Sequence, residues 1–456
     1  MSMYNQSISK THIIDPVYNR ANFKAEYRLE PNSVYFSSMR LVNIGIEATT
    51  GQKGYNKMVG SYGILKNILL MDDNEVLDSL NDANRFLAFK NYNQQNQKNM
   101  DVNQSTAKNA LGTVWSGVET GATGAGPKLN EWAVNPSKTG TIGATTLTLP
   151  LDNNRGQSKG WLDLKEALPL LKSLDSLDTR VFTNLKLVVE YSADLNDYME
   201  DTTDTNSATF EAQLIVDEII DENEKDAMAW PGAVSYTSIE HDLVRVPGLT
   251  APADISAANQ TPIQSLQFKV NGFLNKSLGR MLICKAPTLL ANYKTTNENH
   301  FAGKWASTAC SEEVLNLRVN GVTKLPGAGI DREAQRLAML NDTWGQSSAY
   351  MCSSGQAYKA LDAGADARST LVKVGNDTIG VFDFYGVFIN DKVLDLQVDF
   401  KREGAYVYTS NPVVVATDNT ATTAAVHNQA IDLHVFAEVY KSIVSAKDGT
   451  YTVNYL

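Results

Sequence analysis

The sequence predicts an all-β protein made of two antiparallel sandwiches in tandem, each with a small helical insertion. Two separated stretches end in the same way, with a pair of long strands whose residues alternate between apolar and polar. These pairs are Leu185–Tyr191 with Phe210–Ile220, and Val393–Phe400 with Ile431–Val444. At 456 residues the chain also exceeds what one hydrophobic core usually serves, so two domains are expected.

Strand-like segments dominate the first half of the chain. They are short, rich in β-branched and aromatic residues, and separated by turns of Gly, Asn and Asp, which is typical of sandwiches. The predicted strands are Phe23–Leu29, Val34–Ile46, Gly63–Met71, Thr145–Leu149, Leu185–Tyr191 and Phe210–Ile220.

One longer helix is expected among these strands, ending near Asn91. Its apolar residues would share one helical face and follow two candidate caps, Asp73 and Asn74. Those apolar residues are Val76, Leu80, Ala83 and Leu87. A second helical pattern, Leu164–Leu174, contains Pro169 and therefore predicts only a short helical turn.

The boundary between the two sandwiches is expected where the acidic stretch Asp221–Asp226 and the break at Trp230–Gly232 follow a long apolar strand. The predicted domains are an N-terminal arm at 1–22, a first sandwich at 23–225 and a second at 226–456. A helix is expected at Asp331–Leu340. The strands expected in the second half are Ser235–Val246, Ile263–Phe273, Arg280–Cys284, Leu315–Val319, Ile379–Ile389, Val393–Phe400 and Ile431–Val444.

Composition narrows the possible partners. The net charge of −11 argues against a free-standing nucleic-acid binder, which needs clustered Lys and Arg, so protein partners are expected.

The first 28 residues hold four cations and are interpreted as a solvated, partly disordered arm. Three scattered cysteines have neither disulfide nor zinc spacing. Without a recognisable signal region or membrane span, folding is expected in the cytosol or nucleus.

No catalytic residue, cofactor site or metal site is predicted. The glycine cluster Gly121–Gly126 is followed by Pro127 rather than by the lysine of a phosphate loop, so a plain loop is expected. The five histidines lack metal-ligand spacing, and His434 is interpreted as a satisfied or surface side chain. A carboxylate-rich segment, 197–204, is interpreted as a solvated hairpin tip because it lacks the spacing of a calcium loop.

Several segments together resemble, in order and over nearly the whole chain, the double jelly-roll major capsid proteins of polinton-like viruses and virophages. In the first half these segments are Tyr62–Asp73, Phe89–Asn93, Leu162–Leu171 and Asn184–Tyr191. In the second half they are Leu317–Gly321, Gly329–Asp331, Leu340–Gly345, Asp383–Gly386, Val393–Asp399 and the strand that closes at Val444.

The resemblance implies two tandem eight-stranded jelly rolls, and a homotrimer that forms a pseudohexameric capsomer of an icosahedral shell. Implied partners are copies of the chain itself, neighbouring capsomers, a penton protein and minor capsid proteins. The arm would lie at the capsid interior, where contact with an internal membrane is a further expectation. The protein would be found in the virion after assembly in the host cytoplasm or nucleus, without secretion, enzymatic activity or specific nucleic-acid binding.

Four tryptophans in or beside proposed loops are candidate interface anchors: Trp115, Trp132, Trp230 and Trp305. Trp115 and Trp132 lie in Gly112–Gly143, a long stretch that predicts a loop at a partner surface. Each of the four could equally fill the core of its own domain. Two other functions stay open: a transient lattice-forming scaffolding protein of the same fold, and a carbohydrate-binding or carbohydrate-cleaving β-sandwich.

Overall fold

The computed structural model consists mainly of antiparallel strands. It describes residues 9–19, 23–45, 60–87, 139–142, 145–148, 160–193, 212–247, 263–287, 313–319, 322–323, 378–389, 396–403, 431–445 and 450–456. The chain divides into two compact units. The first unit comprises Met1–Leu87, Asp101–Glu240 and Glu438–Leu456, and the second comprises Ala88–Met100 and His241–Ala437.

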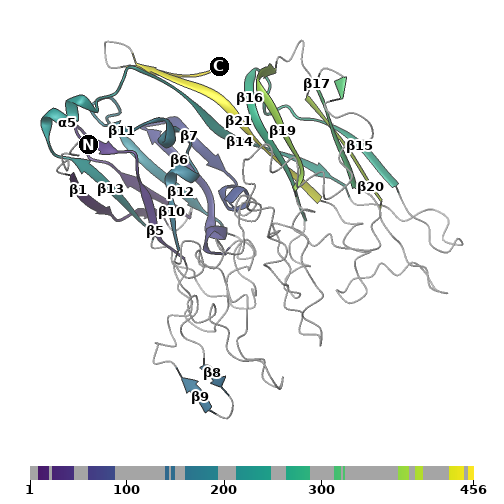
Figure 1. The fold of residues 1–456 in the computed structure, drawn as a ribbon, viewed down its shortest axis with the longest axis horizontal. Coiled ribbons are helices and arrows are strands. Elements are labelled where there is room, and N and C mark those ends of the chain that lie inside the picture. The colour runs from purple at the N-terminus through teal and green to yellow at the C-terminus, as the bar shows by residue number, and fades with distance from the viewer. Residues whose placement is uncertain are drawn as a thin grey trace, which may run out of the picture. The chain divides into compact units, whose positions relative to one another are not determined.

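The first unit contains two large sheets (Figure 1). One has the order β10-β5-β13-β4-β11, with β1 pairing on β13, and the other has the order β2-β3-β12-β6-β7. The strands of the first sheet are β1 Ser9–Ile14, β4 Val34–Phe36, β5 Arg40–Ile44, β10 Gly160–Asp163, β11 Ser176–Asp178 and β13 Gln213–Ile219. Those of the second are β2 Val17–Asn19, β3 Lys24–Arg28, β6 Leu65–Asp72, β7 Glu75–Asn81 and β12 Leu185–Tyr191.

Alternation along these strands builds the core of the first unit. In β12, Leu185, Leu187 and Val189 are buried while Lys186 and Glu190 are partly exposed, as expected of a strand with one face on a core. The two sheets are also joined by a polar contact. The hydroxyl of Tyr27 on β3 donates a hydrogen bond of 2.6 Å to the carbonyl of Ala212, directly before β13. Both sheets therefore share one buried layer.

Short helices follow the strands of the first unit: η1 Gly60–Ile64, η2 Leu164–Glu166, α4 Leu170–Ser173 and α5 Glu222–Ala227. The predicted short helical turn near Pro169 is confirmed, since this residue lies between η2 and α4. The acidic stretch after β13 forms α5. Its first turn is capped by the Asp221 carboxylate, which accepts hydrogen bonds from the backbone N–H groups of Asn223 and Glu224 at 2.9 and 3.1 Å.

Replacing Asp221 with alanine should destabilise this helix, because two backbone N–H groups lose their acceptor. The expected cost is about 1 kcal/mol in the free energy of local opening. Amide hydrogen exchange at Asn223 and Glu224 measures it. Asp221→Asn is the matched control, because asparagine is an equally good cap, and equal exchange in the alanine and asparagine variants would refute the cap's contribution.

The remaining long strands form two further antiparallel sheets. One sheet has the order β14-β21-β16-β19, with β22 pairing on β21, and the other has the order β15-β20-β17-β18. The boundary between the units falls inside β14, after Glu240, and inside β21, before Glu438. The strands are β14 Ala233–Val246, β15 Ile263–Lys269, β16 Lys276–Pro287, β17 Glu313–Val319, β18 Val322–Thr323, β19 Thr378–Ile389, β20 Leu396–Glu403, β21 Ile431–Ser445 and β22 Tyr451–Tyr455.

Most predicted strands occur at the predicted residues, but one predicted strand and one predicted helix need correction. The expected strand Val34–Ile46 is two strands, β4 and β5, interrupted at residues 37–39, where the Met39 N–H bonds the Ser37 carbonyl. The expected helix from Val76 is wrong over its first half. Residues 75–81 form β7, which pairs with β6 in a hairpin, and helical residues begin only at 83.

The reason for the second error is local. Asp73 and Asn74 are the two residues between β6 and β7, and Asp73 has a φ of 52°. Aspartate tolerates this left-handed conformation, so the pair makes a tight hairpin turn rather than a helix cap. In the hairpin, Leu77 is buried and Val76 is exposed, which reverses the burial that a helical face would require.

The N-terminal segment also differs from expectation. Residues 9–14 were expected to lie in a partly disordered arm, but they pair with β13 as β1, and residues 17–19 pair with β3 as β2. The end of the predicted loop Gly112–Gly143 forms β8, Thr139–Ile142, which pairs with β9, Thr145–Thr148. The expected helix Asp331–Leu340 lies outside the described residues. The domain limits 1–22, 23–225 and 226–456 stay a prediction.

Candidate functional site

Of the four tryptophans predicted as interface anchors, the structure describes only Trp230. Trp115, Trp132 and Trp305 lie outside the described residues. Trp230 lies between α5 and β14 and is half-buried. Nothing in the described residues brings the four together, and the interface role stays a prediction for each of them.

Trp230 contacts other residues of the first unit. Its indole N–H donates a hydrogen bond of 3.1 Å to the hydroxyl of Ser445, and its backbone N–H donates one of 3.2 Å to Asp178. The ring of Phe182 packs edge-on against it, with centroids 4.9 Å apart. Tyr451 also packs edge-on with Phe182, with centroids 5.1 Å apart. Trp230 thus helps to hold the C-terminal strands on the first unit.

His12, Glu218 and Ser33 form a cluster whose residue types invite a catalytic interpretation. The Ser33 hydroxyl donates to one oxygen of Glu218 at 2.7 Å, and the His12 imidazole lies 2.8 Å from the other oxygen. Burial raises the pKa of Glu218, but the bonds from Ser33 and His12 outweigh it and hold that pKa below its usual value. Nucleophilic catalysis would need the hydroxyl bonded to the imidazole. Here both bond the carboxylate, so the cluster fastens β1 to β13.

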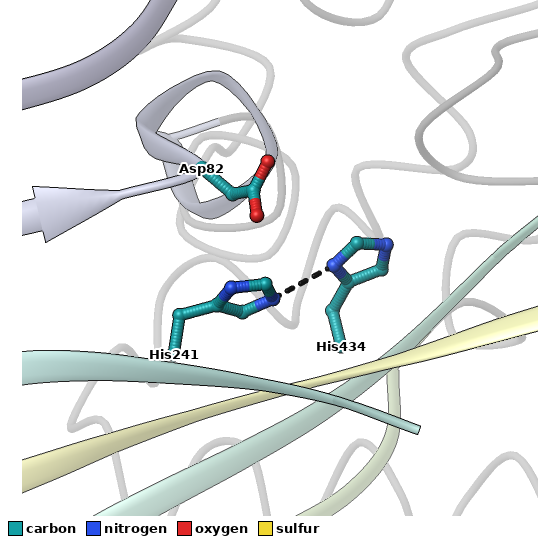
Figure 2. A group of neighbouring side chains, drawn as sticks. All are labelled: Asp82, His241 and His434. Carbon is teal, nitrogen blue, oxygen red and sulfur yellow. Dashed lines mark hydrogen bonds between the residues drawn. The ribbon is translucent and has the colours of Figure 1, made fainter. Parts of the chain in front are cut away.

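Figure 2 shows the imidazole of His241, on β14, hydrogen-bonded to that of His434, on β21. The two nitrogens lie 2.9 Å apart, and the rings stack with centroids separated by 5.1 Å. Phe436 packs against His241 at 4.7 Å. His434 is therefore a buried side chain with its polar group satisfied, as the sequence interpretation had it. Asp82, also drawn in Figure 2, belongs to the first unit, where it forms an ion pair with Lys66.

A third polar cluster surrounds Asp78 on β7. Its side chain is fully buried and accepts hydrogen bonds from the Ser238 hydroxyl at 2.7 Å, and from the backbone N–H groups of Leu170 and Ser79, each at 2.9 Å. Desolvation raises the pKa of this carboxyl from 3.8 to about 6, although the three hydrogen bonds and the charge of Lys441 act in the opposite direction. Burial therefore outweighs hydrogen bonding here.

Lys441 on β21 joins this cluster. Its ammonium lies 3.0 Å from the Glu240 carboxylate and 3.4 Å from the Ser238 hydroxyl, and it sits 4.9 Å from the ring centroid of Tyr455. The hydroxyl of Tyr236 on β14 donates to the Leu77 carbonyl on β7. This cluster could not be predicted from the sequence, because a single aspartate in a short strand gives no sign that its side chain is buried.

None of the helices in the part of the chain that the structure describes has the length and apolarity of a membrane span. The three clusters each bind residues of the fold to one another. In each cluster the hydrogen bonds and ion pairs join strands or the segments next to them.

No protein-family model matches the chain, and no curated protein matches it in sequence. The chain is similar to a crystal structure of PBCV-1 VP54, fitted into a reconstruction of the virophage Sputnik, with 10% identity, a TM-score of 0.50, and coverage of 100% of this chain and 99% of the other. A quasi-atomic model of the PBCV-1 virus capsid gives 10% identity, a TM-score of 0.52 and the same coverage. The mavirus major capsid protein gives 11% identity, a TM-score of 0.49 and coverage of 98% and 90%.

The two PBCV-1 comparisons define the class of fold. They span the whole of this chain and nearly the whole of the other, so the likeness includes both halves. The chain has the double jelly-roll fold that the sequence predicted.

Proposed function

We propose that this chain is a major capsid protein, whose copies trimerise into pseudohexameric capsomers that tile an icosahedral shell. The observation that carries the proposal is the full-length likeness in fold to the PBCV-1 capsid protein, with 100% of this chain and 99% of the other covered. A likeness restricted to one sandwich would have suggested only a common β-module. A likeness over both halves supports a common architecture of the whole subunit.

The duplicated module gives a physical reason for this function. A flat shell needs contacts with sixfold character, whereas a threefold oligomer of single modules offers only three equivalent edges. Three chains with two similar modules each can present six similar edges. In this proposal the modules are residues 23–225 and 226–456, and residues 1–22 face the capsid interior, where they could meet an internal membrane.

The clusters of the described residues agree with a role without catalysis. The Ser33 hydroxyl bonds a carboxylate instead of a base, and the buried Asp78 carboxyl is closed off by hydrogen bonds from β14 and α4. The proposed function includes no enzymatic activity, no cofactor and no specific nucleic-acid binding. The proposed partners are other copies of the chain, a penton protein and minor capsid proteins, in a virion assembled in the host cytoplasm or nucleus.

A transient scaffolding protein of the same fold would also form lattices, but it would leave before the particle matures. A mass-spectrometric census of purified mature virions separates the two roles. As a major capsid protein, the chain should be the most abundant polypeptide of the particle. Its absence from mature virions would contradict the capsid assignment and favour the scaffold.

Deleting most of Gly112–Gly143 tests the predicted subunit contact. If this segment joins subunits, a variant lacking 112–138, which keeps β8, should fold but trimerise at least tenfold more weakly, because interface anchors such as Trp115 and Trp132 are lost. Sedimentation over a range of protein concentrations measures the association. The control is the double variant Trp115→Ala and Trp132→Ala in the full-length chain. Unchanged trimerisation together with a lower melting temperature would instead assign the segment to the subunit core.

A further inference from the structure

The last residues of the chain belong to the first compact unit. That unit is otherwise built from residues before Glu240, yet it also includes Glu438–Leu456. We call three elements of it the latch strands: the part of β14 up to Glu240, the part of β21 from Glu438, and β22. The first compact unit therefore includes strands from the end of the chain.

The latch strands are held together and fastened to the first unit by specific contacts. The Ser445 N–H donates to the Gly232 carbonyl at 2.8 Å, and the Ser445 hydroxyl accepts from the indole of Trp230 at 3.1 Å. Tyr451 of β22 packs against Phe182. β22 pairs with β21 from Lys441 to Ser445, so these two strands are expected to detach as one piece.

Asp78 is fully buried and is hydrogen-bonded to a latch strand. Its carboxyl accepts a hydrogen bond from Ser238, which belongs to a latch strand, and from the backbone N–H of Leu170 at the start of α4. Ser238 in turn receives a hydrogen bond from Lys441. Opening of the latch strands would expose Asp78 to water, whereas closing removes this carboxyl from water entirely.

We propose that the latch strands form a conformational latch on the first unit, and that proton binding to Asp78 tightens it. Mild acid would then close the latch firmly, and neutral or higher pH would loosen it.

The direction follows from linkage. Burial raises the pKa of Asp78 to about 6 in the closed state, against an ordinary 3.8 once water reaches it. The closed state therefore binds the proton more tightly, and its extra stability, fully present below pH 3.8, is lost as pH rises through about 6. Among the described residues, Lys441 from β21 and Tyr236 from β14 interact electrostatically with Asp78. Glu240 on β14 and Tyr455 on β22 contact Lys441 in turn. From α4 the backbone N–H of Leu170 donates to Asp78, and from β6 the residue paired with Asp78 is the apolar Leu70.

Hydrogen exchange of the full-length protein at pH 5.0 and 7.5 tests the proposal, after correction for the intrinsic exchange rate. Linkage between the two values of the Asp78 pKa predicts that the amides of residues 236–240, 441–445 and 451–455 open about tenfold more often at pH 7.5. The amides of β12 are the internal control and should not change. Equal opening of the latch strands at both pH values would overturn the proposal.

Two variants identify the titrating group. Asp78→Asn should abolish the pH dependence of latch opening, and persistence of the tenfold change would overturn the assignment to Asp78. If this variant does not fold, Ser238→Ala tests the same assignment. It keeps Asp78 but removes a hydrogen bond that lowers the pKa of Asp78. The midpoint of loosening should then move to higher pH. A midpoint that stays in place would exclude Asp78 as the group that controls the latch.

Discussion

Replacing Lys441 with methionine is expected to lower the free energy of unfolding of the purified protein by about 3 kcal/mol at pH 7, because it strands a partly buried negative charge. The Lys441 and Glu240 side chains are only 9% and 16% exposed, and their charged atoms lie 3.0 Å apart. Methionine matches the aliphatic stem of lysine, so the loss reports the charge and not the volume. Urea unfolding at a fixed protein concentration measures the change.

Two further variants isolate this effect. Lys225→Met breaks the pair with Glu222, which is 79% exposed, and should change stability by less than about 0.5 kcal/mol. Adding Glu240→Gln to Lys441→Met removes the stranded charge and should recover about half of the loss. If Lys441→Met cost no more than Lys225→Met, the buried pair would contribute nothing to the attachment of β21.

Phe182→Ala should be the more damaging substitution, with an expected loss of about 4 kcal/mol in the free energy of unfolding. The ring is fully buried and packs edge-on with both Trp230 and Tyr451, at centroid distances of 4.9 and 5.1 Å. Its removal leaves a cavity and breaks two edge-to-face contacts at once. Urea unfolding at a fixed protein concentration, followed by fluorescence, measures the change in stability.

The matched control for this experiment is an apolar residue that is not packed. Ile13 on β1 is 63% exposed, so Ile13→Ala should change stability by less than about 0.5 kcal/mol. Phe182→Leu keeps most of the apolar volume and should recover more than half of the loss. A loss below about 1 kcal/mol for Phe182→Ala would mean that the site collapses around the gap, and that the ring does not anchor the C-terminal strands.

The strands could be predicted because their alternation is a local signal that burial enforces. In β12, Leu185, Leu187, Val189 and Tyr191 are buried while Lys186 and Glu190 are partly exposed, and the predicted bounds Leu185–Tyr191 agree with the structure. Only Val188, which is also buried, departs from the alternation within this strand. In β7 the same rule failed. Val76, Leu80, Ala83 and Leu87 have helical spacing, but pairing with β6 selects the strand up to Asn81. Tertiary pairing overrides a helical pattern when the preceding turn allows a hairpin.

The polar clusters could not be predicted, because each joins residues far apart in the sequence. Asp78 receives its hydrogen bonds from Leu170 and Ser238, and Lys441 reaches the same place from near the end of the chain. Sequence position says nothing about such contacts until the topology is known. For His434 the sequence predicted a satisfied or a surface side chain, because the residue lies within an alternating strand. Its burial and its bond to His241 decide between the two.

The chain's likeness in fold to the PBCV-1 capsid protein at only 10% identity has a physical basis. A sandwich is specified by where apolar residues face inward and where turns occur, and many different side chains satisfy both demands. The same fold can therefore form from very different side chains. This is consistent with a likeness in fold where no family model matches the sequence.

The most direct test of the proposed capsid function is the mass of the purified protein in solution, measured by analytical ultracentrifugation at near-physiological salt and pH. A capsomer-forming chain of 49.9 kDa should sediment as a stable trimer of about 150 kDa, with interfaces above about 2,000 Å² that keep it together on dilution. A monomer that persists at micromolar concentration would contradict the account.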